Sequence, residues 1–285
     1  MPELNYRLVN VFTAGKGKLT GNPLCVFEDA RDLDSDTMQR LALQFNLSET
    51  TFMLPSTRAD AKVRIFTPHY EMPFAGHPTL GTAFVCHALR GGERSLTLEM
   101  QAGIIPVSGP MSGNHERWSF QANAPTWRDI TVSRAALAEM LGLQAGDIGE
   151  RPLWVDVGKE QLIVPLTSEA AVRRVRPDVA GFAAERSHDG HSMAYVFAET
   201  APGRTLARFF FPAGSALIED PATGSATANF GGWLLAMERH KPVSVEISQG
   251  EYTGRPSTLF LDVDAEGRIH VAGDVIELGR GSVRL

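Results

Sequence analysis

A pattern that occurs twice constrains the fold of this chain more than any other feature of its sequence. An apolar run that begins at Arg64 is followed by the segment Glu71-Met-Pro-Phe-Ala-Gly76. A second apolar run, beginning at Arg208, is followed by Glu219-Asp-Pro-Ala-Thr-Gly224. The spacing of Glu, Pro and Gly is the same in both copies, although the loops before the glutamates differ in length. This pattern indicates an internal duplication.

Each copy continues into a segment with the composition of a buried helix. Residues 78–89 and 226–238 are apolar on almost every side, and each segment starts just after a glycine. A helix that is apolar all round is normally buried within a fold. The sequence therefore predicts an α+β fold of two similar lobes, each with strands wrapped around one central buried helix.

The rest of the chain is dominated by short β-rich runs separated by turns rich in Gly, Pro and Asn, which is typical of strands joined by tight connections. Two polar-faced helices are also predicted, at residues 37–45 with Asp36 as the cap and at 134–141 with Ser133 as the cap. The predicted strands are residues 8–12, 24–27, 51–54, 63–66, 153–157, 161–164, 193–197, 206–211, 243–247, 258–263 and 269–276.

A break in this pattern predicts where one lobe ends. A Gly-Pro-Met-Ser-Gly-Asn segment interrupts the strands, which places the boundary near residues 111–116. We therefore expect a first lobe of residues 1–114 and a second lobe of residues 115–274. The last strand, at about residues 275–285, is expected to return to the first lobe.

Charge and cysteine content narrow the class of protein. The chain has 285 residues and a net charge of −6, without the clustered Lys and Arg that a nucleic-acid surface needs. Its two cysteines, Cys25 and Cys86, form no C-x-x-C pair and are expected to be buried free thiols, as in a reducing compartment. No apolar signal core or membrane-length run is present. We expect a cytoplasmic protein that contacts neither nucleic acid nor membrane.

The two glycines that precede the buried helices are candidate anion sites. The first turn of a helix leaves backbone N–H groups unpaired, and the helix dipole adds positive potential there. A glycine lets an anion approach that backbone closely. Gly76 with His77, and Gly224 with Ser225, could therefore hold a substrate carboxylate. The alternative is that both glycines serve packing only, but the duplication and the polar residues at both ends favour the anion site.

Three side chains are candidates for acid–base chemistry. Glu49 begins a β-branched run, and a carboxylate in an apolar cleft has a raised pKa that suits proton transfer near neutral pH. Solvated acids at strand edges are common, however, so Glu49 could instead be a solvent-exposed residue without a function. Asp220 and His77 flank the helix starts, where each could instead be a helix cap or, for His77, a core residue.

At these residues the sequence resembles the PhzF-like (phenazine biosynthesis) family, which is similar to diaminopimelate epimerase in fold. The shared motifs occur in family order and span nearly the whole chain. In that fold each half wraps a mixed, barrel-like sheet around a central helix, and the active site lies between the halves. The motifs are Gly21-Asn-Pro-Leu-Cys-Val-Phe27, Ser48-Glu-Thr50, Glu71-Met-Pro-Phe-Ala-Gly-His-Pro-Thr79, Glu219-Asp-Pro-Ala-Thr-Gly-Ser-Ala226 and Gln249-Gly-x-x-x-Gly-Arg-Pro-Ser257.

The resemblance implies roles for individual residues. Glu49 would be the general acid/base, and His77 and Asp220 would hold polar groups of the substrate and assist proton movement. The implied activity is a cofactor-independent isomerisation of a small unsaturated amino or hydroxy acid, such as a dihydro-hydroxyanthranilate, by a homodimer without a metal. The implied substrate-binding residues are Asn22, Gly76, Gly224 and Ser225.

One departure from the wider fold bears on the reaction. The cysteine-dependent epimerases of this fold carry a Cys before each helix-start glycine, whereas this chain has Ala75 and Thr223 there. This chain therefore lacks both of the thiol bases that a two-cysteine racemisation needs. A single carboxylate remains, which favours isomerisation over epimerisation.

Three rival functions are weaker. A hydrolase could use Ser225, His77 and Asp220, but Ser225 lacks the Gly-x-Ser-x-Gly setting of an exposed nucleophile. Metal sites could be imagined from His188, Asp189 and His191, or from His69 and His77, but neither set has the spacing of a strong zinc signature. A small-molecule binding protein of the same fold without isomerase activity is the main alternative.

Overall fold

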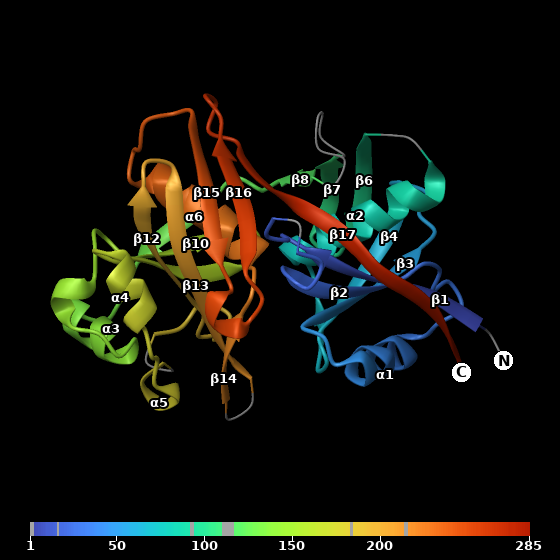
Figure 1. Cartoon of the computed structure of the whole chain (residues 1–285), viewed down its shortest axis with the longest axis horizontal. Helices are drawn as coiled ribbons and strands as arrows, with labels where there is room; N and C mark the ends of the chain where they lie inside the picture. Colours follow the sequence, from blue (N-terminus) through green and yellow to red (C-terminus); the bar gives the residue numbers. More distant parts are fainter. Residues whose placement is uncertain (1–2, 16, 92–93, 110–116, 183–184, 214–215) are drawn as a thin grey trace. The chain divides into compact units, whose positions relative to one another are not determined.

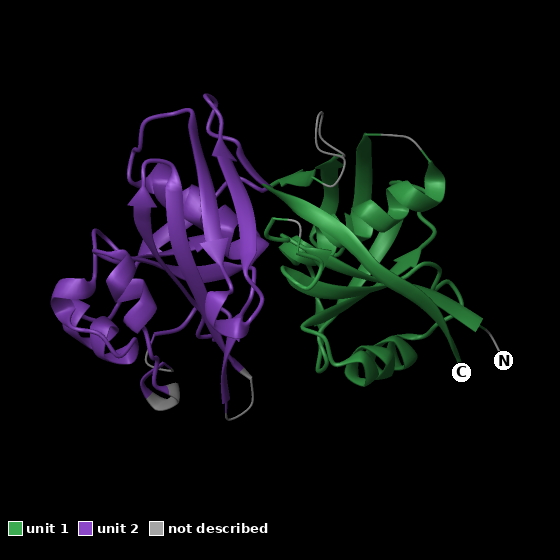
Figure 2. Cartoon of the chain, in the orientation of Figure 1, with its two compact units in different colours: residues 1–121, 272–285 green, residues 122–271 purple. Residues whose placement is uncertain are grey.

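The computed structural model describes residues 3–15, 17–91, 94–109, 117–182, 185–213 and 216–285. The chain forms two compact units, coloured separately in Figure 2. Unit 1 contains Met1–Gln121 and Ala272–Leu285, and unit 2 contains Ala122–Val271. The boundary segment predicted at residues 111–116 lies outside the described residues. Strand β8 (Arg117–Gln121), which the sequence assigned to the second lobe, belongs to unit 1 because it pairs with β7 (Gly103–Ser108).

Unit 1 is a closed barrel. Its strands follow the order β1, β2, β3, β4, β6, β7, β8 and β17, and β17 pairs with β1 to close the ring. The other elements of unit 1 are β1 (Glu3–Val11), β2 (Asn22–Phe27), α1 (Ser35–Phe45), β3 (Glu49–Leu54), β4 (Ala61–Phe66), β5 (Glu71–Met72), α2 (Gly76–Arg90), β6 (Ser95–Met100) and β17 (Ile269–Arg284).

Unit 2 repeats the connectivity of unit 1. In unit 1, β2 and β3 are parallel, β3–β4–β5 are antiparallel, and β4 is parallel to β6. In unit 2 the same relations hold for β11 and β12, for β12–β13–β14, and for β13 and β15. The elements of unit 2 are β9 (Thr126–Asp129), α3 (Arg134–Met140), β10 (Leu153–Asp156), β11 (Glu160–Pro165), α4 (Glu169–Arg174), α5 (Val179–Phe182), β12 (Ala194–Ala201), β13 (Arg204–Ala213), β14 (Ala216–Asp220), α6 (Gly224–Ala236), β15 (Val243–Gln249), β16 (Ser257–Val263) and the 3-10 turns Ala145–Asp147 and Glu251–Thr253.

The two helices predicted to be buried are the central helices of the units (Figure 1). Helix α2 packs against β1, β2, β3, β6 and β8, and α6 packs against β9, β10, β11 and β16. Both helices are buried over most of their length, which confirms the prediction from their composition. Close packing explains Gly81 in α2, because a Cβ there would lie 2.5 Å from Leu24 Cδ2.

Both copies of the repeated Arg and Glu form ion pairs across a hairpin. Arg64 on β4 binds Glu71 on β5 at 2.6 Å, and Arg208 on β13 binds Glu219 on β14 at 2.7 Å. In each copy the glutamate is paired in the ladder with a phenylalanine, Phe66 or Phe210, and the guanidinium lies over that ring. The duplicated residues therefore hold the hairpin that leads into the central helix.

The caps of the surface helices were predicted with mixed success. Ser133 caps α3 as predicted, accepting a hydrogen bond from Ala136 N at 3.2 Å. The prediction of Asp36 as the cap of α1 was wrong. Asp34 is the cap and accepts from Thr37 N at 2.8 Å, while Asp36 lies in the first turn and pairs with Arg40.

The two cysteines are buried free thiols, as predicted. Burial raises the pKa of Cys25 and also that of Cys86. Within the described residues, no helix has the length and apolarity needed to cross a membrane.

Candidate active site

Glu49 and His77 lie together in unit 1. Glu49 is the first residue of β3, and His77 is the second residue of α2. Glu49 Oε2 lies 3.4 Å from His77 Nε2, and the two side chains are 15% and 5% exposed, respectively. A carboxylate and an imidazole this close, shielded from most of the solvent, lie within reach of a hydrogen bond when the carboxyl group is protonated.

The imidazole of His77 is neutral at physiological pH. Burial lowers the pKa of His77 to about 3, and a hydrogen bond to the backbone of Pro23 opposes that shift only in part. A neutral ring has one nitrogen that donates and one that accepts. His77 is therefore suited to accept a hydrogen bond from a protonated Glu49 rather than to hold a fixed positive charge beside it.

This shift predicts how stability depends on pH. The folded-state pKa of His77 lies below its ordinary value of 6.5, so the unfolded chain takes up the proton first as the pH falls. The contribution of His77 to stability is complete above about pH 6.5 and is lost as the pH falls towards about 3. Between pH 6.5 and 5, wild type should lose about 2 kcal/mol more unfolding free energy than His77→Gln. Urea denaturation across this pH range measures the difference, and parallel curves would contradict the prediction.

Asn22 supports the segment that carries Glu49. It is the fully buried first residue of β2, and its Oδ1 accepts a hydrogen bond from Ser48 Oγ at 3.1 Å. Strands β2 and β3 run parallel, with Leu24 opposite Glu49. The contact of Asn22 therefore fixes the entry into β3 directly before Glu49.

The start of α2 keeps its backbone donors free of a side-chain cap. Gly76 is the first helical residue and is buried, and the cap residue Ala75 makes no side-chain hydrogen bond. The same is true in unit 2, where Gly224 begins α6 after the cap residue Thr223. Uncapped first turns present N–H groups and the positive end of the helix dipole. Both helix starts therefore have the chemistry of an anion site.

Asp220 ends β14, and the turn at residues 221–223 separates it from the start of α6. Its side chain is buried, and its Oδ2 accepts a hydrogen bond from Thr223 Oγ1 at 2.5 Å. Asp220 is thus not the cap of α6, which was the alternative interpretation from the sequence. In unit 2 the acid is bound to the residue that immediately precedes the glycine.

Ser225 is oriented by a chain of amide side chains. Its Oγ accepts from Gln161 Nε2 at 3.1 Å, and Gln161 Oε1 accepts from Asn229 Nδ2 at 2.8 Å. Asn229 Oδ1 in turn accepts from Val157 N at 3.0 Å. Because its oxygen accepts from Gln161, the Ser225 hydroxyl can donate its hydrogen to a ligand. An amide cannot serve as the base that a serine nucleophile needs, so this contact does not resemble a hydrolase triad.

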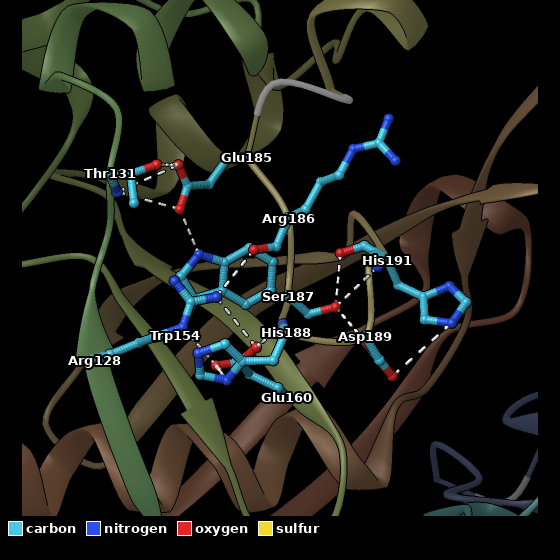
Figure 3. Close-up of polar contacts among 10 residues, drawn as sticks. All are labelled: Arg128, Thr131, Trp154, Glu160, Glu185, Arg186, Ser187, His188, Asp189 and His191. Carbon is cyan, nitrogen blue, oxygen red and sulfur yellow. Dashed lines mark hydrogen bonds and ion pairs between the residues drawn. The ribbon is translucent and has the colours of Figure 1, made fainter.

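The hairpin that carries Gln161 is itself fixed by two buried carboxylates (Figure 3). Arg128 binds Glu160 at 2.7 Å and lies over the ring of Trp154, whose Nε1 donates to Glu185 at 2.6 Å. Glu160 also accepts from the backbone N of His188. These contacts attach the loop that follows Glu185 to strands β9, β10 and β11.

Glu185 offers a test of this support. Its oxygens accept from Trp154 Nε1, from Thr131 N and Oγ1 and from Val132 N, and the residue is 2% exposed. Glu185→Gln would turn an amide N–H₂ towards one of these donors, so it should lower the unfolding free energy by about 2 kcal/mol. Chemical denaturation of the variant, with the exposed Glu199→Gln as control, measures the loss. Equal stability of the two variants would contradict the assigned role.

Several supporting residues were not among the predicted site residues, although Gln249 begins the Gln-Gly-x-x-x-Gly-Arg-Pro-Ser motif. Gln161, Asn229 and Gln249 reach residues far away in the chain, and only the structure brings them to the helix starts. Of the histidines considered for a metal, His77 lies beside Glu49, whereas His188 and His191 are exposed. His191 Nε2 is 3.9 Å from Asp189. Among the described residues, no three potential ligands are grouped as a metal site would require.

Known proteins resemble this chain over its full length. The PhzC-PhzF family model, described as phenazine biosynthesis-like protein, matches residues 9–280. An uncharacterized isomerase of Pasteurella multocida is 38% identical over 98% of this chain and 93% of that protein. A trans-2,3-dihydro-3-hydroxyanthranilate isomerase of Pseudomonas chlororaphis is 35% identical over 99% of both chains.

Solved structures give the same result. A PhzF-family phenazine biosynthesis protein of Bacillus anthracis superposes with a TM-score of 0.87, at 26% identity and with complete coverage of both chains. A probable proline racemase of Agrobacterium radiobacter has a TM-score of 0.65 at 10% identity, covering 99% of this chain and 93% of that one, and so shares the fold alone. The expected fold class is thereby confirmed, and the chain belongs to the phenazine biosynthesis-like PhzF family, as an isomerase of that family.

Proposed function

We propose that this isomerase moves a proton on a small unsaturated amino or hydroxy acid without a cofactor, with Glu49 as the acid/base. The observation that carries the proposal is the Glu49–His77 pair, with 3.4 Å between Oε2 and Nε2 and little exposure of either side chain. The substrate class follows relatives named trans-2,3-dihydro-3-hydroxyanthranilate isomerase, which are 34–35% identical to this chain.

In the proposed reaction Glu49 removes a proton from a carbon next to the unsaturated system. The electron pair of that C–H bond shifts the double bond, and the protonated Glu49 returns the proton to another carbon. Neutral His77 can accept a hydrogen bond from the protonated carboxyl group, which holds it in place between the two steps. No atom is gained or lost, so the reaction needs no co-reactant.

The helix starts are assigned to the substrate's polar groups. In unit 1 we assign Gly76 and Asn22 to substrate binding, and in unit 2 Gly224 and Ser225. Backbone N–H groups at a helix start stabilise a carboxylate and the negative charge that develops on deprotonation. Asp220 is assigned to holding a polar substituent of the substrate. The proposal also includes a homodimer, as the family resemblance implies, and a cytoplasmic location, which is in keeping with the two free cysteines.

Proton exchange with solvent tests the proposed function. The protein is incubated in D₂O with a panel of small unsaturated and amino acids that includes trans-2,3-dihydro-3-hydroxyanthranilate, and the products are read by NMR. We expect a shifted double bond with deuterium at the newly protonated carbon of at least one compound. Binding of a compound without exchange or isomerisation would instead favour a binding protein of the same fold.

A further inference from the structure

Gln249 has three hydrogen bonds to the residues around Asp220. It is the last residue of β15 and is 2% exposed. Its Nε2 donates to the backbone oxygen of Asp220 and to Thr223 Oγ1, both at 3.0 Å. Its Oε1 accepts from Thr223 N at 3.3 Å. One buried amide thus binds both sides of the turn that connects β14 to α6.

These contacts set the direction of the hydrogen bond to Asp220. A hydroxyl group has a single hydrogen. Because Thr223 Oγ1 accepts from Gln249 Nε2, its hydrogen is left for Asp220 Oδ2, which lies 2.5 Å away. Gln249 therefore orients the Thr223 hydroxyl as a donor to Asp220, and that contact fixes the rotamer of the carboxyl group.

The residues after Gln249 keep its backbone in place. Gly250 adopts the left-handed conformation with φ +82°, and a Cβ there would lie 2.5 Å from Pro221 O and 2.3 Å from Arg255 O. The turn closes with Arg255 N donating to Gly250 O at 3.1 Å and Ser257 Oγ donating to Arg255 O at 2.9 Å. The Gln-Gly-x-x-x-Gly-Arg-Pro-Ser motif thus forms a tight turn that packs against the residue following Asp220.

We propose that Gln249 is a positioning residue for the isomerase reaction, acting through Thr223 to hold the Asp220 carboxyl group and the first turn of α6 in their reactive arrangement. Only the expected loss in kcat rests on the proposed function. The structural part stands on the hydrogen bonds of Gln249 to Thr223 and Asp220.

Kinetics of the full-length protein test the catalytic part. Gln249→Leu keeps the volume of the side chain and removes all three hydrogen bonds, so kcat should fall about 10- to 100-fold through misplacement of Asp220, with a smaller change in KM. Gln101→Leu, at an exposed turn of unit 1, is the matched control and should leave kcat unchanged. In an Asp220→Asn background, Gln249→Leu should add little further loss, because both changes affect one unit. A kcat within twofold of wild type, or losses that multiply in the double variant, would overturn the proposal.

A second variant and a crystal structure separate this inference from the proposed function. Thr223→Val removes only the hydroxyl between Gln249 and Asp220, and should reproduce the loss in kcat even if Gln249→Leu folds poorly. In a crystal structure of either variant, the Asp220 carboxyl group should leave the position it has in wild type. An unmoved Asp220 would overturn the inference. A wild-type protein inactive on every compound would refute the proposed function alone, since the crystallographic comparison needs no substrate.

Discussion

Glu49→Gln is expected to lower kcat by about 10²–10⁴-fold, the contribution of a positioned acid/base, with little change in KM. Glutamine keeps the length and shape of the side chain but cannot take up a proton. Its amide also remains within reach of His77, whose Nε2 lies 3.4 Å from Glu49 Oε2. The loss should therefore come from the chemical step, measured as the rate of isomerisation and of deuterium incorporation.

Two controls test whether the loss comes from the missing base and whether it is specific to Glu49. Glu49→Asp retains a base but moves it back by one methylene, so it should keep more activity than Glu49→Gln. Glu99→Gln alters an acid of similar exposure, 18% against 15%, that pairs with Arg58 and should leave kcat unchanged. Full activity of Glu49→Gln would eliminate Glu49 as the acid/base. A large loss in Glu99→Gln would show that the effect is not specific to Glu49.

Arg208→Met is expected to lower the unfolding free energy by about 3–5 kcal/mol, the cost of leaving a buried charge without its partner. The side chain of Arg208 is 5% exposed and binds Glu219 as well as the backbone oxygens of Val172 and Val175. The substitution removes all of these donors at once. Guanidinium denaturation followed by far-UV circular dichroism measures the change.

The duplication supplies a matched control for this prediction. Arg64 makes the equivalent pair with Glu71, but both side chains are about one-fifth exposed, at 20% and 21%, and water can solvate the remaining carboxylate. Arg64→Met should therefore cost only about 1–2 kcal/mol. The double variant Arg208→Met with Glu219→Leu should recover part of the loss, because it removes the unpaired charge. Equal losses in Arg208→Met and Arg64→Met would show that burial does not set the strength of this pair.

The sequence predicts those parts of the fold that depend on local pattern. The buried helices are evident because residues 78–89 and 226–238 lack a polar face, and every predicted strand overlaps an observed one. Strands β5 to β9 and β14 are not among the predicted ones. Most of them are short or alternate with polar residues, so their apolar signal is weak. The error at α1 has a similar cause, since Asp34 and Asp36 are both plausible caps from composition and only backbone geometry distinguishes them.

The candidate site was predictable only where a residue lies beside a recognisable element. The ends of strands and helices can be located from the residues around them, and five of the predicted site residues lie at such ends: Glu49, His77, Gly76, Gly224 and Ser225. Gln161 and Gln249 act across the fold through side-chain hydrogen bonds to Ser225 and Thr223. Such contacts leave no periodicity in the sequence, because hydrogen-bonded partners far apart in the chain meet only after the strands have paired.

The path of β17 has a consequence for synthesis on the ribosome. This strand leaves unit 2 and closes the barrel of unit 1 by pairing with β1, from Val11 opposite Val275 to Glu3 opposite Arg284. Strand β1 is synthesised before β17, so the barrel cannot close on β1 until β17 follows. Unit 2 can complete its own core earlier, whereas the nascent first unit keeps an open seam between β1 and β8 until β17 has been synthesised. Unpaired strand edges promote association between chains, so nascent unit 1 should depend on chaperones more than unit 2 does.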